Sequence, residues 1–236
     1  MSKNIKRPTI ITIKGKTDGF GAQFQAIMSG FAFARYNNYV YRHTAFKSIA
    51  HYNYPFEMNT FCGFKSDKND ISSHKVDIVY KYIQPVHRSC VPDIYYTQNV
   101  LDEMRKLYMT TEKPPKCKYD VAIHIRRGDV NLSSEIRYTP NKLYLTVMNF
   151  IRKKYNNISF CIYSEGNEKD FELLKNHDVI FSLNTNIKNT FHEMVTAKIL
   201  VMAKSSFSYC AALLSQGEIL YIPFWHKPLK HWNIVR

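Results

Sequence analysis

At Val121-Ala122-Ile123-His124-Ile125-Arg126-Arg127-Gly128-Asp129 an apolar run meets a cluster of charges. Alternating apolar and β-branched residues predict a buried strand from Tyr119 to Ile125, which two arginines, a glycine and an aspartate bring to an end. Ligands of an open α/β sheet bind at the carboxyl ends of its strands, where loops converge beside helix N-termini. Two guanidinium groups at such a place suit a diphosphate, because each is permanently charged and offers a planar fork to phosphate oxygens.

Gly128 and Asp129 extend this interpretation. Gly128 lets the backbone turn closely, and Asp129 can brace one arginine so that the other faces a ligand. The alternative is a plain surface salt bridge at the end of the strand, between Asp129 and Arg126 or Arg127, since short motifs also occur by chance.

The composition is that of a globular chain that attracts anions. Its 236 residues suffice for one large domain or two small ones, and 45% hydrophobic and 14% aromatic residues can form a core. The 33 lysines and arginines exceed the 19 aspartates and glutamates, which gives a formal net charge of +14. This excess favours a nucleotide, a nucleic acid, an acidic glycan or peripheral contact with a membrane surface, without choosing among them.

The cysteines and the N-terminus indicate a reducing compartment. The five cysteines are widely spaced and include no Cys-x-x-Cys pair, so neither a zinc site nor a disulfide framework is expected. The basic segment from Met1 to Arg7 lacks the apolar core of a signal peptide, and no stretch approaches the roughly 18 apolar residues of a transmembrane segment. We therefore expect a cytoplasmic protein without a transmembrane segment.

Strands alternate with helices along most of the chain. Apolar spacing predicts strands at 9–13, 77–83, 119–125, 158–163, 179–181, 199–202 and 219–222, and helices at 22–36, 99–108, 140–155, 169–176, 190–198 and 207–214. This alternation indicates an α/β fold with right-handed crossovers and mostly parallel sheets. Lys113-Pro114-Pro115-Lys116 interrupts regular structure and marks a linker between two lobes, 1–116 and 117–236.

Polar side chains follow three strands of the C-terminal half. They are the charged end of the central strand, then Ser164-Glu165, then Ser205-Ser206. The carboxyl ends of parallel strands share one edge of a sheet, so these residues are expected to line one cleft. The arginines and the helix that starts at Ser206 would hold phosphate, while Glu165 and His124 would contact the rest of a nucleotide. A plain helix cap at Ser205 and Ser206, and a solvated loop carboxylate at Glu165, are the alternatives.

A glycine-containing loop follows the first strand. Strand, loop and helix in this order, with Gly19, Gly21 and Gln23 in the loop and helix start, are typical of a turn that cradles a nucleotide or a sugar. The loop is not a phosphate-binding P-loop, because Gly15-Lys16-Thr17 is preceded by Ile10 where that motif has its first glycine, and a tight turn without a ligand would also explain the glycines. His43, His51, His74 and His87 do not have the spacing of metal ligands, so no metal site is expected.

Three motifs in chain order resemble the superfamily of α1,2-, α1,6- and protein O-fucosyltransferases. The segment from His124 to Asp129 resembles its His-x-Arg-Arg-Gly-Asp motif, and Ser205-Ser206-Phe207-Ser208 with the helix behind it resembles its late Ser-x-Phe-Ser motif. Gly19-Phe20-Gly21-Ala22-Gln23 is similar to its early Gly-Gly-x-Gly-Asn-Gln motif, with two positions changed. The resemblance covers nearly the whole chain. It implies a GT-B-like fold of two Rossmann-like lobes, a GDP-fucose donor, a glycan acceptor, inversion, and neither a metal nor another cofactor.

The same resemblance assigns roles to single residues. It implies an N-terminal lobe on the acceptor side and a C-terminal lobe that binds the nucleotide sugar. In that lobe Arg126 would contact the donor β-phosphate. The donor-binding positions are His124, Arg126, Arg127, Glu165, Ser205, Ser206 and Phe207. Glu135 is the candidate general base and Asp129 the second choice.

The expected chemistry agrees with transfer without a metal ion. Negative charge develops on the departing diphosphate, and the sequence contains no Asp-x-Asp motif to hold a metal ion against it. Arg126 and a helix N-terminus would then supply the positive field, while a base on the opposite side takes the proton of the acceptor hydroxyl.

Two alternatives remain open at this point. The net charge of +14 and the 17 tyrosines would suit a nucleic-acid-binding protein, although the sequence contains no RNP, KH or zinc pattern. The other alternative keeps the fold and uses a different GDP-, UDP- or TDP-sugar. Golgi relatives carry a membrane anchor, and no such segment is visible in this sequence. We therefore expect a protein of the cytoplasm of a bacterium or of a virus-infected host cell.

Overall fold

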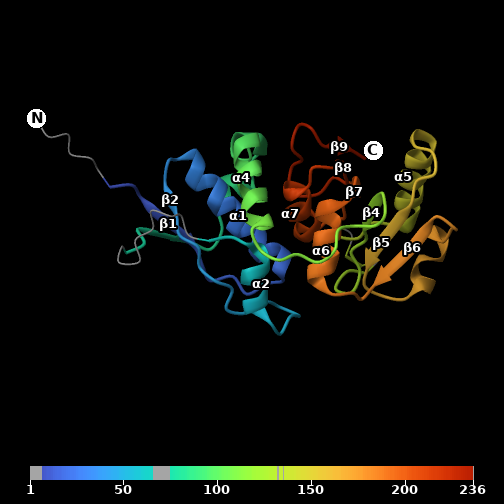
Figure 1. Ribbon diagram of the computed structural model, residues 1–236, viewed down its shortest axis with the longest axis horizontal. Coiled ribbons are helices and arrows are strands. Elements are labelled where there is room, and N and C mark those ends of the chain that lie inside the picture. The colour runs from blue at the N-terminus through green and yellow to red at the C-terminus, as the bar shows by residue number, and fades with distance from the viewer. Residues whose placement is uncertain (1–6, 66–74, 132, 135, 236) are drawn as a thin grey trace, which may run out of the picture. The chain divides into compact units, whose positions relative to one another are not determined.

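The computed structural model describes residues 7–65, 75–131, 133–134 and 136–235 (Figure 1). The chain divides into two compact units, Met1–Glu112 and Lys113–Arg236. The division falls at Lys113, the first residue of the proline-containing linker. The sequence analysis placed it after residue 116.

A three-stranded parallel sheet forms the centre of the N-terminal unit. Its strands are β1 (Ile10–Ile13), β2 (Val40–Tyr41) and β3 (Ile78–Tyr80), in the order β2-β1-β3. All four residues of β1 are buried, as expected for the middle strand of a covered sheet.

Helix α1 (Phe20–Tyr36) packs closely against this sheet. A Cβ atom at Gly30 would lie 3.3 Å from the Tyr41 ring and still nearer to the Ile13 side chain, so only glycine allows this approach. Phe24 and Phe31 of α1 each meet the Phe64 ring edge to face, with centroid distances of 5.3 and 5.6 Å. The unit also contains α2 (Pro55–Cys62), α3 (Gln84–His87), η1 (Pro92–Ile94) and α4 (Gln98–Met109).

The sequence analysis missed four of these short elements, namely β2, α2, α3 and η1. It also extended β3 by one residue at its start and three at its end. Strand β2 is too short for a periodic signal. Helix α2 did carry a signal, because Pro55 opens it and Gly63, in the left-handed conformation at φ 69°, closes it.

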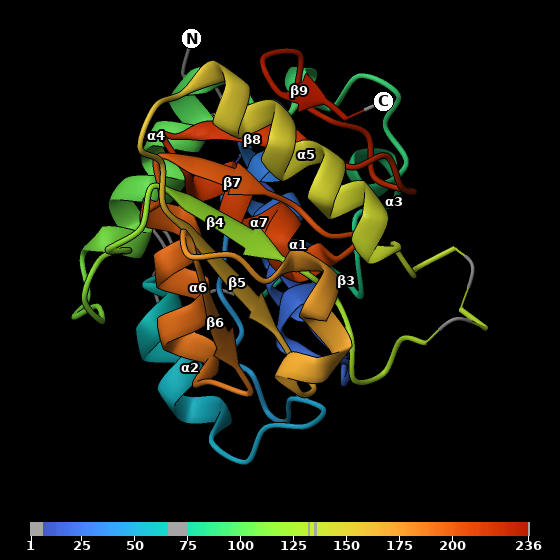
Figure 2. The ribbon, with the colours of Figure 1, turned by 90° about the vertical axis from the view of Figure 1, so that its right-hand side faces the viewer.

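The C-terminal unit contains a six-stranded sheet in which every pairing is parallel (Figure 2). The strands are β4 (Val121–His124), β5 (Phe160–Ser164), β6 (Val179–Leu183), β7 (Ile199–Val201), β8 (Glu218–Tyr221) and β9 (Asn233–Ile234), in the order β6-β5-β4-β7-β8-β9. The chain first runs outward from β4 and then returns to β7 on its other side. This is the order of the dinucleotide-binding fold, with its switch point between β4 and β7.

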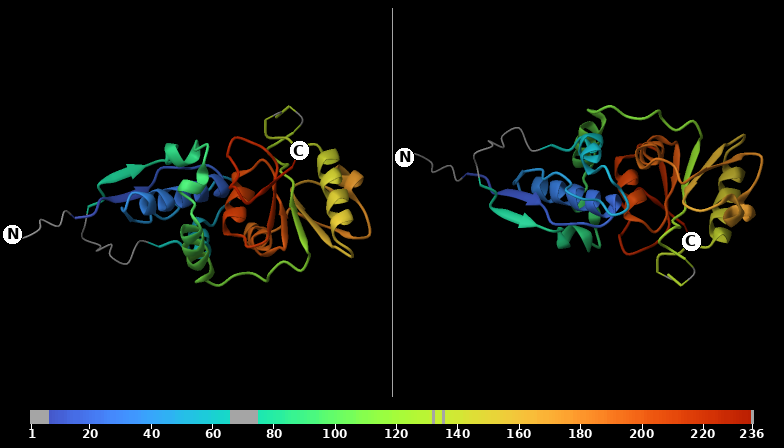
Figure 3. Two further views of the ribbon diagram at one scale, coloured as in Figure 1. Left: turned by 90° about the horizontal axis from the view of Figure 1, so that it is seen from above. Right: turned by 90° about the horizontal axis from the view of Figure 1, so that it is seen from below.

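Helices cover both faces of this sheet, as the two views of Figure 3 show. Residues of α5 (Asn141–Lys154) and η2 (Glu168–Leu174) pack in one hydrophobic core with Val121, Ile123 and Ile125. Helices α6 (Ile187–Thr196) and α7 (Ser206–Leu214) pack against each other and lie on the opposite face. Because side chains alternate along β4, His124 points towards α6 and α7.

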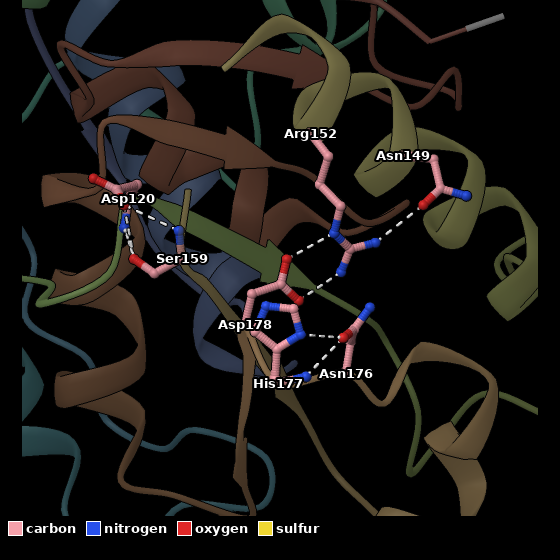
Figure 4. A network of polar contacts seen from close by, with 7 residues as sticks. All are labelled: Asp120, Asn149, Arg152, Ser159, Asn176, His177 and Asp178. Atoms are coloured by element: carbon pink, nitrogen blue, oxygen red, sulfur yellow. Dashed lines mark hydrogen bonds and ion pairs between the residues drawn. The ribbon is translucent and has the colours of Figure 1, made fainter. Parts of the chain in front are cut away.

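The amino-terminal edge of the sheet is held by ion pairs (Figure 4). Arg152, in the last turn of α5, donates to both carboxylate oxygens of Asp178, each at 2.7 Å. Asp120, just before β4, accepts from the Ser159 hydroxyl at 2.7 Å and from Lys198 at 2.7 Å. The hydrogen bonds from Lys198 and Ser159 lower the pKa of Asp120 to about 2. These contacts align the starts of β4, β5, β6 and β7.

The expected α/β fold with parallel sheets is confirmed, and some expected details are wrong. Strand β9 follows the strand that was expected to be the last. Helix α7 begins one residue before its predicted start and ends at Leu214 with Ser215 as its cap. Glycine is needed at 217 because a Cβ atom would lie 2.6 Å from the Lys198 carbonyl oxygen. Within the part of the chain that is described, no helix has both the length and the apolar character that crossing a membrane requires.

Candidate functional site

The residues expected at the site lie at the carboxyl edge of the C-terminal sheet, beside the switch point. The loops that follow β4 and β7 start on neighbouring strands. The loop after β5 is tied to the end of β4, because the Ser164 hydroxyl donates to the Ile125 carbonyl at 2.7 Å. Three loops that are far apart in the sequence therefore begin at one place.

Arg126 is partly exposed and is held by Asp129. Its Nε and Nη2 atoms donate to the two carboxylate oxygens at 3.2 and 2.6 Å. The Arg126 hydrogen bond is the largest of the causes that lower the pKa of Asp129. Nη1 has no partner among the described residues, and 22% of the side chain is exposed. The salt bridge considered as an alternative is thus present, and it leaves one edge of the guanidinium accessible.

Arg127 has a different environment from its neighbour. It donates to the backbone oxygens of Arg126 at 2.8 Å and of Thr139 at 3.0 Å, and to the Asn141 side chain at 2.6 Å. Its guanidinium also lies 4.3 Å from the centre of the Tyr138 ring. Arg127 therefore fixes the loop that leads into α5. The structure presents one guanidinium at this edge, where the sequence analysis expected a pair to meet a diphosphate.

Gly128 brings the loops after β4 and β5 into contact. Its φ of 74° lies in the left-handed region, and a Cβ atom there would lie 2.7 Å from the Glu165 carboxyl carbon. The exposed carboxylate of Glu165 thus lies directly over Gly128. It accepts no hydrogen bond from any described residue.

His124, which the sequence analysis expected to contact the nucleotide, is buried. Only 9% of the residue is exposed, and its ring lies 5.5 Å from the Phe207 ring at the start of α7. Burial, assisted by the charge of Arg126, lowers the pKa of His124 to about 3, so the imidazole is neutral at physiological pH. Nδ1 is buried and has no hydrogen-bond partner within the described ranges.

The three serines at the start of α7 differ in their contacts. The Ser205 hydroxyl caps the helix by accepting from the Phe207 N–H at 3.2 Å. Ser208 is buried and bonds to the backbone of Ala203, which fixes the β7–α7 loop. The partly exposed Ser206 hydroxyl has no partner among the residues described. Ser206 is therefore the serine at this helix start that is available to a ligand.

The early glycine motif lies in the N-terminal unit. Gly19 caps α1 with an ordinary φ of −61°, and Gly21 is buried in the first turn. The Gln23 side chain donates to the backbone oxygens of Asp18 at 2.6 Å and of Ser48 at 2.8 Å. Gln23 thus holds two loops together beside a cavity of about 320 Å³.

Two further residues, Glu135 and Asn141, bear on the candidate site. Glu135, the candidate base, lies outside the described residues. The sequence analysis missed Asn141, which holds Arg127 and also donates to the Asp170 carbonyl at 2.6 Å. Its position directly after Pro140, at the start of a helix, was the available signal. Among the described residues, no three His, Cys, Asp or Glu side chains gather as metal ligands.

The sequence match to one family covers almost the whole chain. Residues 7–228 match the model described as glycosyl transferase family 11. The chain belongs to this family. This membership agrees with the resemblance drawn from the three motifs.

Two of the similar proteins carry the name of a glycosyltransferase. The chain is 28% identical over 117 residues to an α-1,2-colitosyltransferase of Escherichia coli, a match that spans 44% of this chain and 39% of that enzyme. POFUT1 in complex with GDP-fucose is similar in structure, with a TM-score of 0.47, 10% identity and 97% of both chains covered. The E. coli heptosyltransferase WaaC, with an ADP-heptose analogue, has a TM-score of 0.44 and 10% identity, with 89% of this chain and 64% of WaaC covered.

Proposed function

We propose that the chain transfers a sugar from a nucleotide diphosphate donor to a glycan hydroxyl, and that the donor is GDP-fucose. Membership of glycosyl transferase family 11 and the three fucosyltransferase-like motifs support the proposal. The structural observation that carries it is Arg126, held by Asp129 with one edge accessible, at the switch point of a doubly wound sheet.

The proposed donor site combines two sources of positive potential. One is Arg126, a planar donor suited to phosphate oxygens. The other is the start of α7, where helix N–H groups and the Ser206 hydroxyl, which bonds to no described residue, attract anions. The contact between His124 and Phe207 joins the end of β4 to this helix start, so both sources lie at one edge. Glu165 would accept hydrogen bonds from the nucleoside.

The charge that develops during transfer determines the proposed mechanism. When the bond from the sugar to the β-phosphate oxygen breaks, the leaving diphosphate gains negative charge. Arg126 and the α7 N-terminus stabilise this charge in place of a metal ion. The acceptor hydroxyl attacks from the opposite side of the sugar and loses its proton to a base, which inverts the configuration.

Glu135 is the base that we propose, and Asp129 acts on Arg126 instead. Asp129 is engaged on both carboxylate oxygens, and its pKa is lowered chiefly by the hydrogen bond from Arg126. A carboxylate with a lowered pKa is a poor proton acceptor near neutral pH. Asp129 is therefore a positioning residue, which sets the orientation of the Arg126 guanidinium.

A panel of nucleotide sugars tests the proposed function. Unfolding midpoints of the full chain would be measured with GDP-fucose, GDP-mannose, UDP- and TDP-sugars, ADP-heptose and GDP alone. We expect GDP and GDP-fucose to raise the midpoint most, and Arg126→Ala to reduce that rise. Because the proposed mechanism uses no metal ion, hydrolysis of GDP-fucose should continue when EDTA removes divalent cations. No shift with any nucleotide would contradict a donor site, and a larger shift with another nucleotide sugar would replace GDP-fucose as the donor.

Family membership favours an enzyme over the nucleic-acid-binding protein considered at first. A cytoplasmic location in a bacterium or infected cell, and peripheral membrane contact through the basic surface, stay predictions from the sequence.

A further inference from the structure

The N-terminal unit has a cavity of about 320 Å³ at the carboxyl end of its sheet. The loop after β1 and the segment that follows β2 form its sides. In a parallel sheet this edge is where ligands bind, so the cavity has the position of a site. Its volume is at the small end of the range of ligand pockets, and suits one sugar unit better than a whole nucleotide.

The floor of the cavity is apolar and its sides are held in place. Ile13, Ile27 and Phe46 line it, and each is at most 4% exposed. Gln23 bonds to the backbone of both loops. The hydroxyls of Thr12 and Thr44, on the strand and on the second loop, are 2.7 Å apart. An apolar floor between fixed polar walls matches a sugar ring, which has an apolar face and a polar edge.

Three lysines surround this floor, and none of the described lining residues is acidic. Lys16 pairs with Asp18 at 2.9 Å, with 14% of the lysine side chain exposed. Lys14 and Lys47 are exposed and pair with no acidic group among the described residues. The cavity therefore carries uncompensated positive charge on two sides, which favours an anionic ligand.

We propose that this cavity binds an acidic sugar, a glycan unit with a carboxylate or phosphate group, as part of the acceptor. The inference rests on the proposed function, because it assigns the cavity to the acceptor of that transfer. The sugar ring covers the floor formed by Ile13, Ile27 and Phe46. Its anionic group reaches Lys14 and Lys47, whose flexible ammonium groups bind carboxylate and phosphate alike as point charges.

The first test is direct binding to the full chain. Methyl glucuronide and a glucose phosphate serve as acidic probes, methyl glucoside is the neutral match, and ligand-observed NMR at low salt gives the affinities. Both acidic probes should bind at least ten-fold more tightly than the glucoside, and added salt should weaken them. Binding of only one acidic probe decides between carboxylate and phosphate. Equal affinity for acidic and neutral sugars would overturn the inference.

Lysine variants then locate the binding. Lys14→Gln/Lys47→Gln should weaken the acidic probes about ten-fold or more, which corresponds to about 1.4 kcal/mol. Lys106→Gln, an exposed lysine of α4 outside the cavity, is the matched control and should bind like the unchanged protein. Unchanged binding in the double variant would place the acidic sugars elsewhere and overturn the inference.

Binding of GDP separates this inference from the proposed function. The double variant should bind GDP as the unchanged protein does. Loss of GDP affinity with unchanged binding of the acidic probes would assign the lysines to the donor, against the inference. If no nucleotide binds while the acidic probes bind with the expected lysine dependence, the proposed donor site fails and the acidic-sugar site stands.

Discussion

Arg126 and Arg127 are adjacent in the sequence and have different surroundings. Arg127 is bound to two backbone oxygens, one side-chain oxygen and an aromatic ring, whereas the Arg126 side chain, among the residues that the structure describes, bonds only to the Asp129 carboxylate. The sequence analysis expected both arginines at the diphosphate, with Asp129 bracing one of them. It could not predict the partners of Arg127, because Thr139 and Asn141 are 12 and 14 residues away, beyond a segment without periodicity.

Arg126→Ala should lower kcat by about 10²–10³, or about 3–4 kcal/mol of transition-state stabilisation. The reason is that the variant removes a fixed positive group from the leaving diphosphate. Steady-state assays of GDP release would measure this loss. Near-normal turnover would remove Arg126 from the mechanism.

Arg152→Ala is a matched control for that variant. Arg152 also forms a two-point pair with an aspartate, and its side chain is 23% exposed compared with 22% for Arg126. Its partner Asp178 directly precedes β6, at the amino-terminal edge of the sheet (Figure 4), whereas the proposed site lies at the carboxyl edge. We expect a loss of stability of about 1–2 kcal/mol and unchanged donor binding.

The burial of His124 predicts a pH dependence of stability. Burial, then the charge of Arg126, lowers its pKa from 6.5 to about 3, so below pH 6.5 the unfolded chain binds a proton that the folded chain does not. The stability that neutral, buried His124 contributes to the folded state is fully present above pH 6.5 and is lost as the pH falls towards 3. Between pH 6.5 and 5, the free energy of unfolding of His124→Phe should fall by about 1–2 kcal/mol less than that of the unchanged protein.

Urea denaturation at several pH values would measure this difference. His87 and His192, whose pKa values burial lowers to about 4, act in the same direction, so part of the pH dependence should persist in the variant. The carboxylates with lowered pKa values titrate below this window. An identical pH dependence in both proteins would show that His124 is not the source.

Element length decided how well the sequence predicted the fold. The long helices α1, α4 and α5 and the apolar strands β4 and β5 have clear periodicity, and their bounds were predicted within a few residues. The two-residue strands β2 and β9 lack that signal, because only pairing with neighbouring strands defines them. Helix α6 begins at Ile187, three residues before its prediction, because Asn186 caps it by accepting from the Lys188 N–H.

At the start of α7, stability and ligand binding should depend on different serines. Ser205→Ala removes the cap of the Phe207 N–H and should lower stability by about 1 kcal/mol. Ser206→Ala removes a hydroxyl that bonds to no described residue, so stability should change by less than about 0.5 kcal/mol. Its affinity for GDP should fall about three- to ten-fold, the value of one hydrogen bond.

Chemical denaturation and titration calorimetry on the two variants provide the comparison. The reversed result would be a loss of stability in Ser206→Ala and a loss of GDP affinity alone in Ser205→Ala. It would mean that Ser206 is the structural residue and that the Ser206 hydroxyl does not bind the phosphate.

At the scale of the whole molecule, the order of strands explains where the site lies. The sequence predicted alternating strands and helices, and therefore parallel sheets. It did not predict which strands are neighbours, because that order depends on contacts between distant segments. Only the observed order shows that the motif after β4 and the serines after β7 follow adjacent strands. The proposed site is thus a consequence of the crossover from β6 back to β7.

The C-terminal unit should fold and bind nucleotide by itself. Its sheet is complete within residues 113–236, and so is the hydrophobic core around β4 and α5. Every described residue proposed to contact the donor also belongs to this unit. A fragment of residues 113–236 should therefore unfold cooperatively and bind GDP within about ten-fold of the full chain, or about 1.4 kcal/mol. It should not transfer sugar, because the proposed acceptor site lies in the other unit. Circular dichroism and calorimetry test both statements, and a folded fragment without affinity for GDP would show that the N-terminal unit contributes to the donor site.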